Sequence, residues 1–259
     1  MKSRPGPFAI SVLALLSAIA GWLLAVAASQ AQEPGAGHIH KLNKRFLGPK
    51  LDVQKFVKKF EGDDRDVFKN RQAILAALAV KPGMKVADVG AGTGLFTRML
   101  AREVGGSGWV FAVDISPGFL EYISTSLKDK GIGNVSPILS RPESVCLPPD
   151  SVDLAFVCDT YHHVEAPGAF LGSIHDALTK DGELAVVEFS HHAMADNKWL
   201  KGHLHKNKKQ VIEEIEKAGF ALKEEKKIET LKDNYFLVFK AVSRPDSGSS
   251  SKSSAHSTD

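Results

Sequence analysis

The chain has 259 residues and a formal net charge of +3. A charge this small over this length gives no reason to expect nucleic acid as a partner, and the length suffices for one well-buried α/β domain once the unusual ends are set aside. The two cysteines, Cys146 and Cys158, are more often found reduced in such a setting than joined in a disulfide.

Residues 1–32 have the composition of a targeting segment. Lys2 and Arg4 precede an apolar run over residues 8–28, and the segment contains no acidic residue. This pattern is typical of a signal peptide or a signal anchor. The run is long enough to span a bilayer, whereas residues 29–31 offer a small-x-small cleavage site, and the balance slightly favours cleavage.

Basic residues on both sides of the apolar run leave its orientation open. We therefore expect a protein that is exported or anchored to a membrane through this segment, with the side of the membrane undetermined. Residues 33–55 are interpreted as a linker and the Ser-rich residues 243–259 as a disordered tail. His38 and His40 occur in the linker without a third or fourth ligand, so we expect no metal site.

A glycine-rich turn follows the first predicted strand. Residues 86–89 have the pattern of a buried strand, and apolar residues recur at helical spacing from Phe96 onward. Between them the glycines are spaced G-x-G-x-G, which differs from the G-x-G-x-x-G of dinucleotide-binding turns. Glycine at such a turn tolerates positive φ and lets a ligand approach the backbone. The glycines in question are Gly90, Gly92 and Gly94.

Two acidic residues indicate which ligand this turn prefers. Asp88 would repel a pyrophosphate and attract an ammonium group. Asp114 ends the next strand, about 20 residues after the glycines, where a carboxylate can accept hydrogen bonds from both ribose hydroxyls. A nucleoside with a free amine satisfies both, and S-adenosylmethionine is such a molecule. The glycine spacing and Asp88 together disfavour an NAD-dependent oxidoreductase.

The remaining pattern alternates helices and strands, which predicts a mainly parallel sheet with right-handed crossovers. Ser116 and Pro117 have the residue types of an N-cap and a first helical position. A short turn near residues 232–234 predicts an antiparallel hairpin at one edge. The predicted helices cover residues 56–78, 117–130 and 166–178, and the later strands cover 152–158, 183–189, 221–228 and 235–241.

Five segments in this order resemble the motifs of class I S-adenosylmethionine-dependent methyltransferases, within the broad group that includes quinone-biosynthesis and other small-molecule methyltransferases. The resemblance covers residues 56–242. It implies a Rossmann-like sheet of seven strands, mainly parallel with an antiparallel C-terminal hairpin, and a small or lipophilic methyl acceptor. The motifs are VADVGAGTG, AVDIS, SVDLAFVCDTYHHV, LTKDGELAVVEF and EKAGF.

The resemblance also implies a cofactor site, with one departure. Family members often carry an acidic and a small residue after the third strand to hold adenine, whereas Arg141 and Pro142 occur here, so we expect Glu143 to take over that contact. An exported cofactor-binding domain without turnover is the alternative, which the intact acidic and glycine residues disfavour. The predicted cofactor-binding residues are Asp88, Gly90, Ala91, Gly92, Gly94, Asp114, Ile115, Glu143 and Asp159.

The loop after the fourth strand is the predicted catalytic segment. His162 and His163 are candidates for a base that removes a proton from the acceptor, because imidazole titrates near neutral pH. Asp159 is expected to orient a histidine or the ammonium group of the cofactor, and Glu188 to steer the acceptor. Further histidines follow the fifth strand and are candidates for acceptor contacts: His191, His192, His203 and His205.

We expect residues 8–28 to carry the full-length chain to a membrane. Deletion of residues 1–32 should leave a soluble, folded domain, because the motifs of the domain all lie beyond this segment. Cell fractionation followed by N-terminal sequencing measures both outcomes. Full-length protein found wholly in the cytosol with its amino-terminal residues intact would contradict the prediction.

Overall fold

The computed structural model describes residues 43–190 and 206–242. The predicted leader, the predicted tail and the histidines at positions 38, 40, 191, 192, 203 and 205 lie outside these residues. Within the described ranges, no helix is long and apolar enough to cross a membrane. Cys146 and Cys158 are both free thiols, as predicted.

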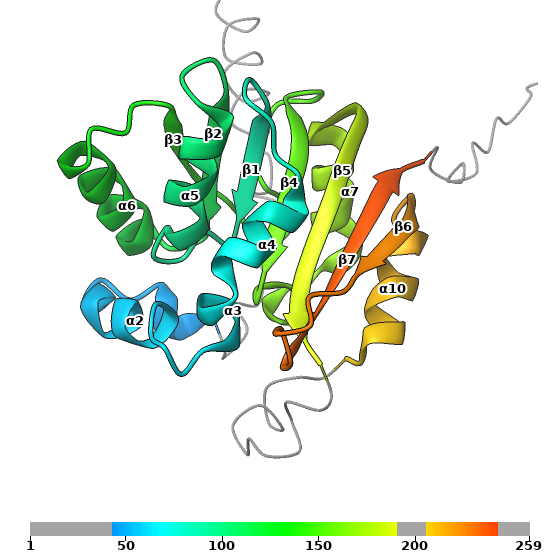
Figure 1. The fold of residues 1–259 in the computed structure, drawn as a ribbon, viewed down its shortest axis with the longest axis horizontal. Coiled ribbons are helices and arrows are strands. Elements are labelled where there is room, and N and C mark those ends of the chain that lie inside the picture. The colour runs from blue at the N-terminus through cyan, green and yellow to red at the C-terminus, as the bar shows by residue number, and fades with distance from the viewer. Residues whose placement is uncertain (1–42, 191–205, 243–259) are drawn as a thin grey trace, which may run out of the picture. The chain divides into compact units, whose positions relative to one another are not determined.

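A seven-stranded sheet in the order β3-β2-β1-β4-β5-β7-β6 forms the centre of the fold (Figure 1). The first five strands pair in parallel, and β7 is antiparallel to both β5 and β6. The predicted sheet and its C-terminal hairpin are confirmed. The strands are β1 Lys85–Val89, β2 Trp109–Asp114, β3 Val135–Leu139, β4 Val152–Cys158, β5 Leu178–Phe189, β6 Phe220–Lys226 and β7 Asn234–Ala241.

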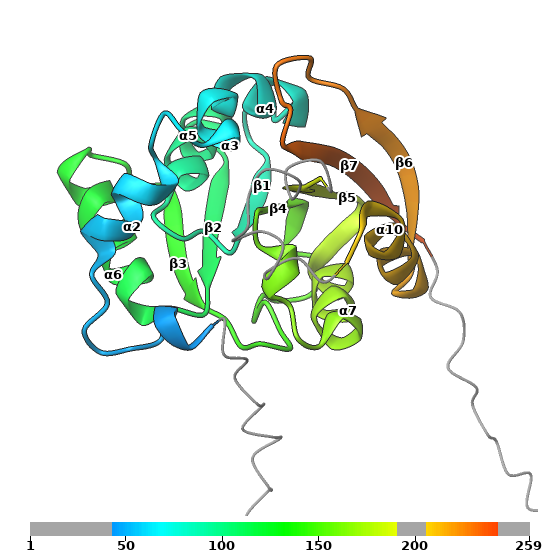
Figure 2. The same cartoon turned by 90° about the horizontal axis from the view of Figure 1, so that it is seen from below.

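Helices cover both faces of this sheet (Figure 2). One face packs against α4 (Arg71–Leu78) and α5 (Leu95–Val104), and the other against α7 (Pro167–Ala177) and α10 (Lys208–Lys217). Burial on both faces explains why the central strands read as continuous apolar runs rather than alternating ones.

The predicted start of α6 (Pro117–Asp129) is confirmed. The Ser116 hydroxyl accepts a hydrogen bond from the backbone N–H of Phe119 at 3.4 Å, and Pro117 is the first helical residue. The same hydroxyl donates to the carbonyl of Phe46 at 2.6 Å. Ser116, which the sequence predicts as an N-cap, therefore also holds the distant segment that contains Phe46.

That segment is the N-terminal cap, residues 43–70, which contains η1 (Lys44–Phe46), α2 (Val53–Phe60) and α3 (Asp66–Lys69). The described part of the expected linker, residues 43–55, forms η1 and the start of α2 within this cap. The reason is a contact between distant residues: Phe46 is buried, with its ring centroid 5.4 Å from that of Phe56 and 5.8 Å from that of Phe119.

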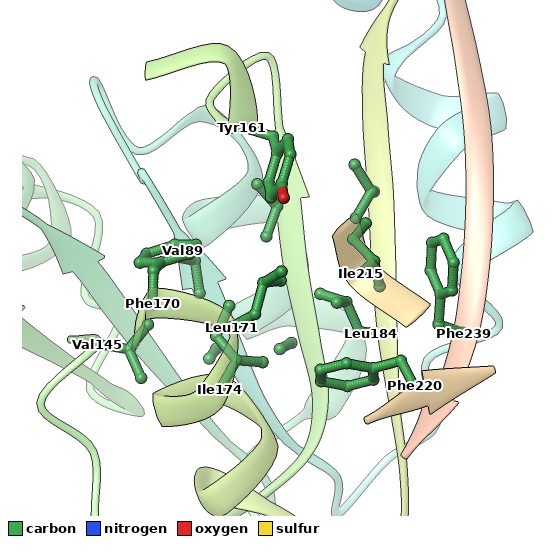
Figure 3. Close-up of a cluster of buried hydrophobic side chains, with 14 of the residues drawn as sticks. Val89, Val145, Tyr161, Phe170, Leu171, Ile174, Leu184, Ile215, Phe220 and Phe239 are labelled. Carbon is green, nitrogen blue, oxygen red and sulfur yellow. The ribbon is translucent and has the colours of Figure 1, made fainter. Parts of the chain in front are cut away.

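Strand β7 lies between β5 and β6, and its apolar side chains are buried on both faces of the sheet. Leu184 of β5, Ile215 of α10 and Phe239 of β7 are fully buried and belong to one cluster on the α7 and α10 face (Figure 3). The C-terminal hairpin is thereby part of the main core rather than an appendage.

Replacement of Leu184 by alanine should lower the free energy of unfolding by about 2–5 kcal/mol, because it opens a cavity at a side chain that is 0% exposed. Leu139→Ala is the matched control: this leucine is 55% exposed on the edge strand β3, and its loss should cost about 0.5 kcal/mol or less. Urea denaturation measures both values. Equal destabilisation by the two substitutions would contradict this description of the core.

Candidate active site

A pocket of about 340 Å³ opens where the carboxyl ends of the parallel strands meet the N-terminal cap. Its volume lies in the range of small-molecule sites. The predicted site residues that line it are Asp88, Gly90, Ala91, Gly92, Asp114, Ile115, Asp159, His162 and His163.

The glycine turn shows why Gly is required at two of its positions. Gly90 has φ of +74°, and an added Cβ would overlap the side chain of Thr160. Gly94 has φ of +76° and begins α5, where an added Cβ would lie 2.8 Å from Ile123 of α6. Gly94 is not among the pocket-lining residues, and its lack of a side chain allows α5 to pack closely against α6.

Two pocket carboxylates are buried with little compensation. Asp88 accepts a hydrogen bond from the Thr97 hydroxyl at 2.5 Å, and Asp114 accepts from the backbone N–H groups of Gly92 and Ser116, each at 2.8 Å. Burial raises the pKa of both carboxyls to about 6, against the opposing effect of these hydrogen bonds. A ligand that brings an ammonium group and hydroxyl donors would relieve this cost, as S-adenosylmethionine does.

Asp159 is held by the protein itself. One carboxylate oxygen accepts from Arg65 of the cap at 2.5 Å, and the other accepts from the Asn234 amide of β7 at 2.5 Å. Asp159 also has φ of +45°, an uncommon conformation for a residue other than glycine. Both oxygens thus join distant segments to the loop after β4, and these contacts position that loop.

His162 forms a buried pair with Glu188 at the end of β5. Its Nδ1 lies 3.0 and 2.9 Å from the two carboxylate oxygens, which also accept from the backbone N–H groups of His162 and Phe189. Burial acts to lower the pKa of His162, but the neighbouring carboxylate outweighs it and raises the pKa above the ordinary value. With Nδ1 held in this way, Nε2 is the atom through which His162 can exchange a proton.

His163 lies in a different setting. Its ring packs edge-on against Phe46 at 5.5 Å between centroids and lies 4.2 Å from the ring of His162. Its backbone carbonyl accepts from the Asn43 amide at 3.1 Å, and that amide also donates to Glu165 at 3.0 Å. The two histidines, equivalent in the sequence pattern, are therefore distinguished by Glu188 and by the cap.

The cap contributes site residues that sequence reasoning missed. Phe46, Phe60 and Arg65 line the pocket, and Arg98 of α5 holds the cap by donating to both carboxylate oxygens of Glu61 at 2.8 Å. The only sequence signal was the amphipathic spacing of α2, because every one of these contacts joins residues distant in the chain.

The segment in which we expect the adenine contact follows β3. Ser140, Arg141 and Pro142 line the pocket after β3, whereas Glu143 is not among the lining residues. Arg141 and Ser144 pair through their backbones in a tight turn, which places Glu143 at the tip of that turn. Among the residues that the structure describes, no cluster of acidic, His and Cys side chains is suited to a metal ion.

A parallel sheet ending in an antiparallel hairpin, with a glycine turn and carboxylates at the ends of β1 and β2, defines the class of S-adenosylmethionine-dependent methyltransferases. Residues 80–235 match the family described as "Methyltransferase domain", and the chain belongs to that family. The protein is an S-adenosylmethionine-dependent methyltransferase, and Asp88, Gly92 and Asp114 are the residues suited to hold the cofactor.

Relatives and solved structures agree with this class. The ubiquinone/menaquinone biosynthesis C-methyltransferase UbiE of Shewanella frigidimarina (strain NCIMB 400) is 36% identical over 113 residues, which are 43% of this chain and 45% of the relative. A methyltransferase structure from Aquifex aeolicus has 25% identity and a TM-score of 0.62, covering 74% of this chain and 100% of its own. One from Mesorhizobium loti, with 18% identity and a TM-score of 0.56 over 69% of this chain and 99% of its own, shares the fold.

Replacement of Asp114 by alanine should weaken S-adenosylmethionine binding by about 1–3 kcal/mol for each lost charge-assisted hydrogen bond, without unfolding the domain. Asp181→Ala, at the exposed amino-terminal end of β5, is the control and should bind normally. Calorimetric titration with S-adenosylmethionine and S-adenosylhomocysteine measures the change. Unchanged affinity in a folded Asp114 variant would show that this carboxylate does not bind the cofactor.

Proposed function

We propose that this enzyme methylates a small, lipophilic acceptor that carries an aromatic ring with an ionisable hydroxyl, such as a phenol or quinol. The observation that carries the proposal is the His162–Glu188 pair, which adds a base to a pocket wall that is otherwise rich in aromatic side chains. That wall is formed by Phe46, Phe60, Phe119, Phe170 and Phe189.

The chemistry follows from the acceptor. The cofactor supplies an electrophilic methyl group on sulfur, and the acceptor attacks it in line from carbon or oxygen. The S–CH₃ bond breaks with its electron pair remaining on sulfur, which leaves S-adenosylhomocysteine. A ring hydroxyl is a poor nucleophile until it loses its proton, and Nε2 of His162 can accept that proton while Glu188 stabilises the imidazolium.

Positioning supplies the other contribution. The cap lies over the glycine turn, where a Cβ added to Gly92 would stand 3.7 Å from the Phe60 ring, and Arg65 fixes the loop that bears His162 through Asp159. Holding acceptor and methyl group in line can contribute up to about 7–11 kcal/mol in favourable cases.

The curated relative supports the choice of acceptor. The name of this relative describes methylation at carbon in ubiquinone and menaquinone biosynthesis. Quinone precursors of that kind combine a lipophilic ring with ionisable hydroxyls. The matched region spans less than half of the relative, so the acceptor of this chain is inferred from the pocket as well as from the name.

Location forms a separate part of the proposal. The apolar run over residues 8–28 supports a protein held at or exported across a membrane, where a lipophilic acceptor would be available. S-adenosylmethionine is made in the cytoplasm, so a membrane-held domain that faces the cytoplasm satisfies both requirements.

His162→Gln should lower turnover by about 10²- to 10⁴-fold and leave cofactor affinity near that of the wild type. Phenols and quinols are first screened for S-adenosylhomocysteine release, and pH–rate profiles are then recorded. The wild-type rate should rise with pH as His162 loses its proton. Glu188→Gln removes the carboxylate that raises the pKa of His162, so the rise should move to lower pH.

His163→Gln is the matched control and should retain the wild-type pH profile, since its ring packs against the cap. If the His162 and Glu188 variants both turn over at the wild-type rate, no base is required at this position, and an acceptor with an ionisable hydroxyl would lose its support.

A further inference from the structure

One stretch of the cap has a charge unlike that of the rest of the chain. Between residues 44 and 59 six cations are exposed, against one acidic residue, Asp52, whose carboxylate caps α2 by accepting from the backbone N–H of Lys55. The whole chain has a net charge of only +3. We call these six cations the basic surface; they are Lys44, Arg45, Lys50, Lys55, Lys58 and Lys59.

The basic surface differs from the other lysine-rich region of the protein. Around α10 and β6, lysines are neutralised in pairs such as Lys206–Glu214 at 2.7 Å and Lys208–Glu225 at 2.9 Å. Over residues 43–190 and 206–242, no ion pair joins an acidic side chain to the lysines of the basic surface at positions 44, 50, 55 and 58. The positive charge of these four lysines is therefore available to an anionic partner.

The cations of the basic surface also lie close together. Burial lowers the pKa of Lys59, and repulsion from Arg45, Arg65 and Lys55 lowers it further. Bringing anionic groups to this surface would relieve that repulsion.

The position of the basic surface connects it to the site. Arg45 and Lys59 line the pocket, so the surface borders its opening. Helix α2 lies beside α6 in both views (Figures 1 and 2), with the Phe56 ring 5.5 Å from that of Phe119. The aromatic face of α2 therefore packs against the protein, and its exposed lysines are left to attract an anionic surface electrostatically.

We propose that the basic surface docks the enzyme on a bilayer containing anionic lipids, with the pocket opening at the lipid surface. The choice of a lipid partner rests on the proposed lipophilic acceptor, which would reach the pocket directly from the bilayer. Each cation brought to an anionic surface strengthens binding by about fivefold at moderate ionic strength. This docking is separate from any contribution of residues 1–32.

The test compares the full chain with a double charge-reversal variant, Lys55→Glu with Lys58→Glu, in vesicle co-sedimentation. These two lysines lie on one face of α2 and do not line the pocket. The control, Lys81→Glu with Lys180→Glu, makes the same charge change at exposed positions near the amino-terminal ends of β1 and β5, away from the pocket. Vesicles contain phosphatidylglycerol with phosphatidylcholine, or phosphatidylcholine alone, and no cofactor or acceptor is added.

We expect the wild type and the control to bind anionic vesicles more tightly than neutral ones, with a difference that falls as salt is raised. The α2 variant should lose at least about tenfold of this lipid-charge-dependent binding. Because residues 1–32 are the same in all variants, any binding through them cancels in the comparison. Equal preference for anionic vesicles in all three proteins would overturn the proposal.

A parallel titration with an unrelated DNA duplex tests whether the basic surface binds nucleic acid instead of lipid. Tighter binding to DNA than to anionic vesicles, lost in the α2 variant, would assign the surface to nucleic acid and overturn docking on lipid. Turnover of soluble phenols is assayed independently. If the enzyme methylates phenols but does not bind vesicles, the proposed function is retained and only the proposal of membrane docking is contradicted.

Discussion

The buried carboxylate of Asp159 is the constraint on which the site depends. It connects Arg65 of the cap and Asn234 of β7 to the loop after β4. A carboxylate removed from water is costly unless it is paired and hydrogen-bonded, and loss of one partner leaves the cost uncompensated. The three segments are therefore held in one arrangement, and the pocket exists because they meet.

The four carboxylates at the ends of the strands divide into two kinds. Asp159 and Glu188 are each engaged by several groups of the chain, and they position the loop and His162. Asp88 and Asp114 line the pocket beside the glycine turn, and burial raises their pKa values to about 6. The first pair organises the protein and the second is poised for a ligand, since a cationic and hydroxyl-bearing cofactor supplies what the chain does not.

The two adjacent histidines, His162 and His163, also differ in the groups that surround them. The carboxylate of Glu188 raises the basicity of His162, whereas the aromatic ring of Phe46 packs against His163. A base needs both a suitable pKa and a fixed orientation. Only the fold, which brings Glu188 to within hydrogen-bond distance across 26 residues of sequence, provides both at one of the two positions.

Sequence by itself determined the features that depend on neighbours in the chain: the glycine turn, the carboxylates at strand ends, the Ser116 cap and the alternation that produces the sheet. Backbone conformation and strand burial impose these patterns locally, so they can be predicted from the sequence alone. Tertiary structure decided that residues 43–55 pack onto the domain, that Gly94 lies against α6, that Glu143 lies at the tip of a tight turn and that His162 is paired with Glu188. All of these except the turn at Glu143 depend on contacts between residues far apart in the chain, and a side chain's pKa and orientation are set by the groups that surround it in space.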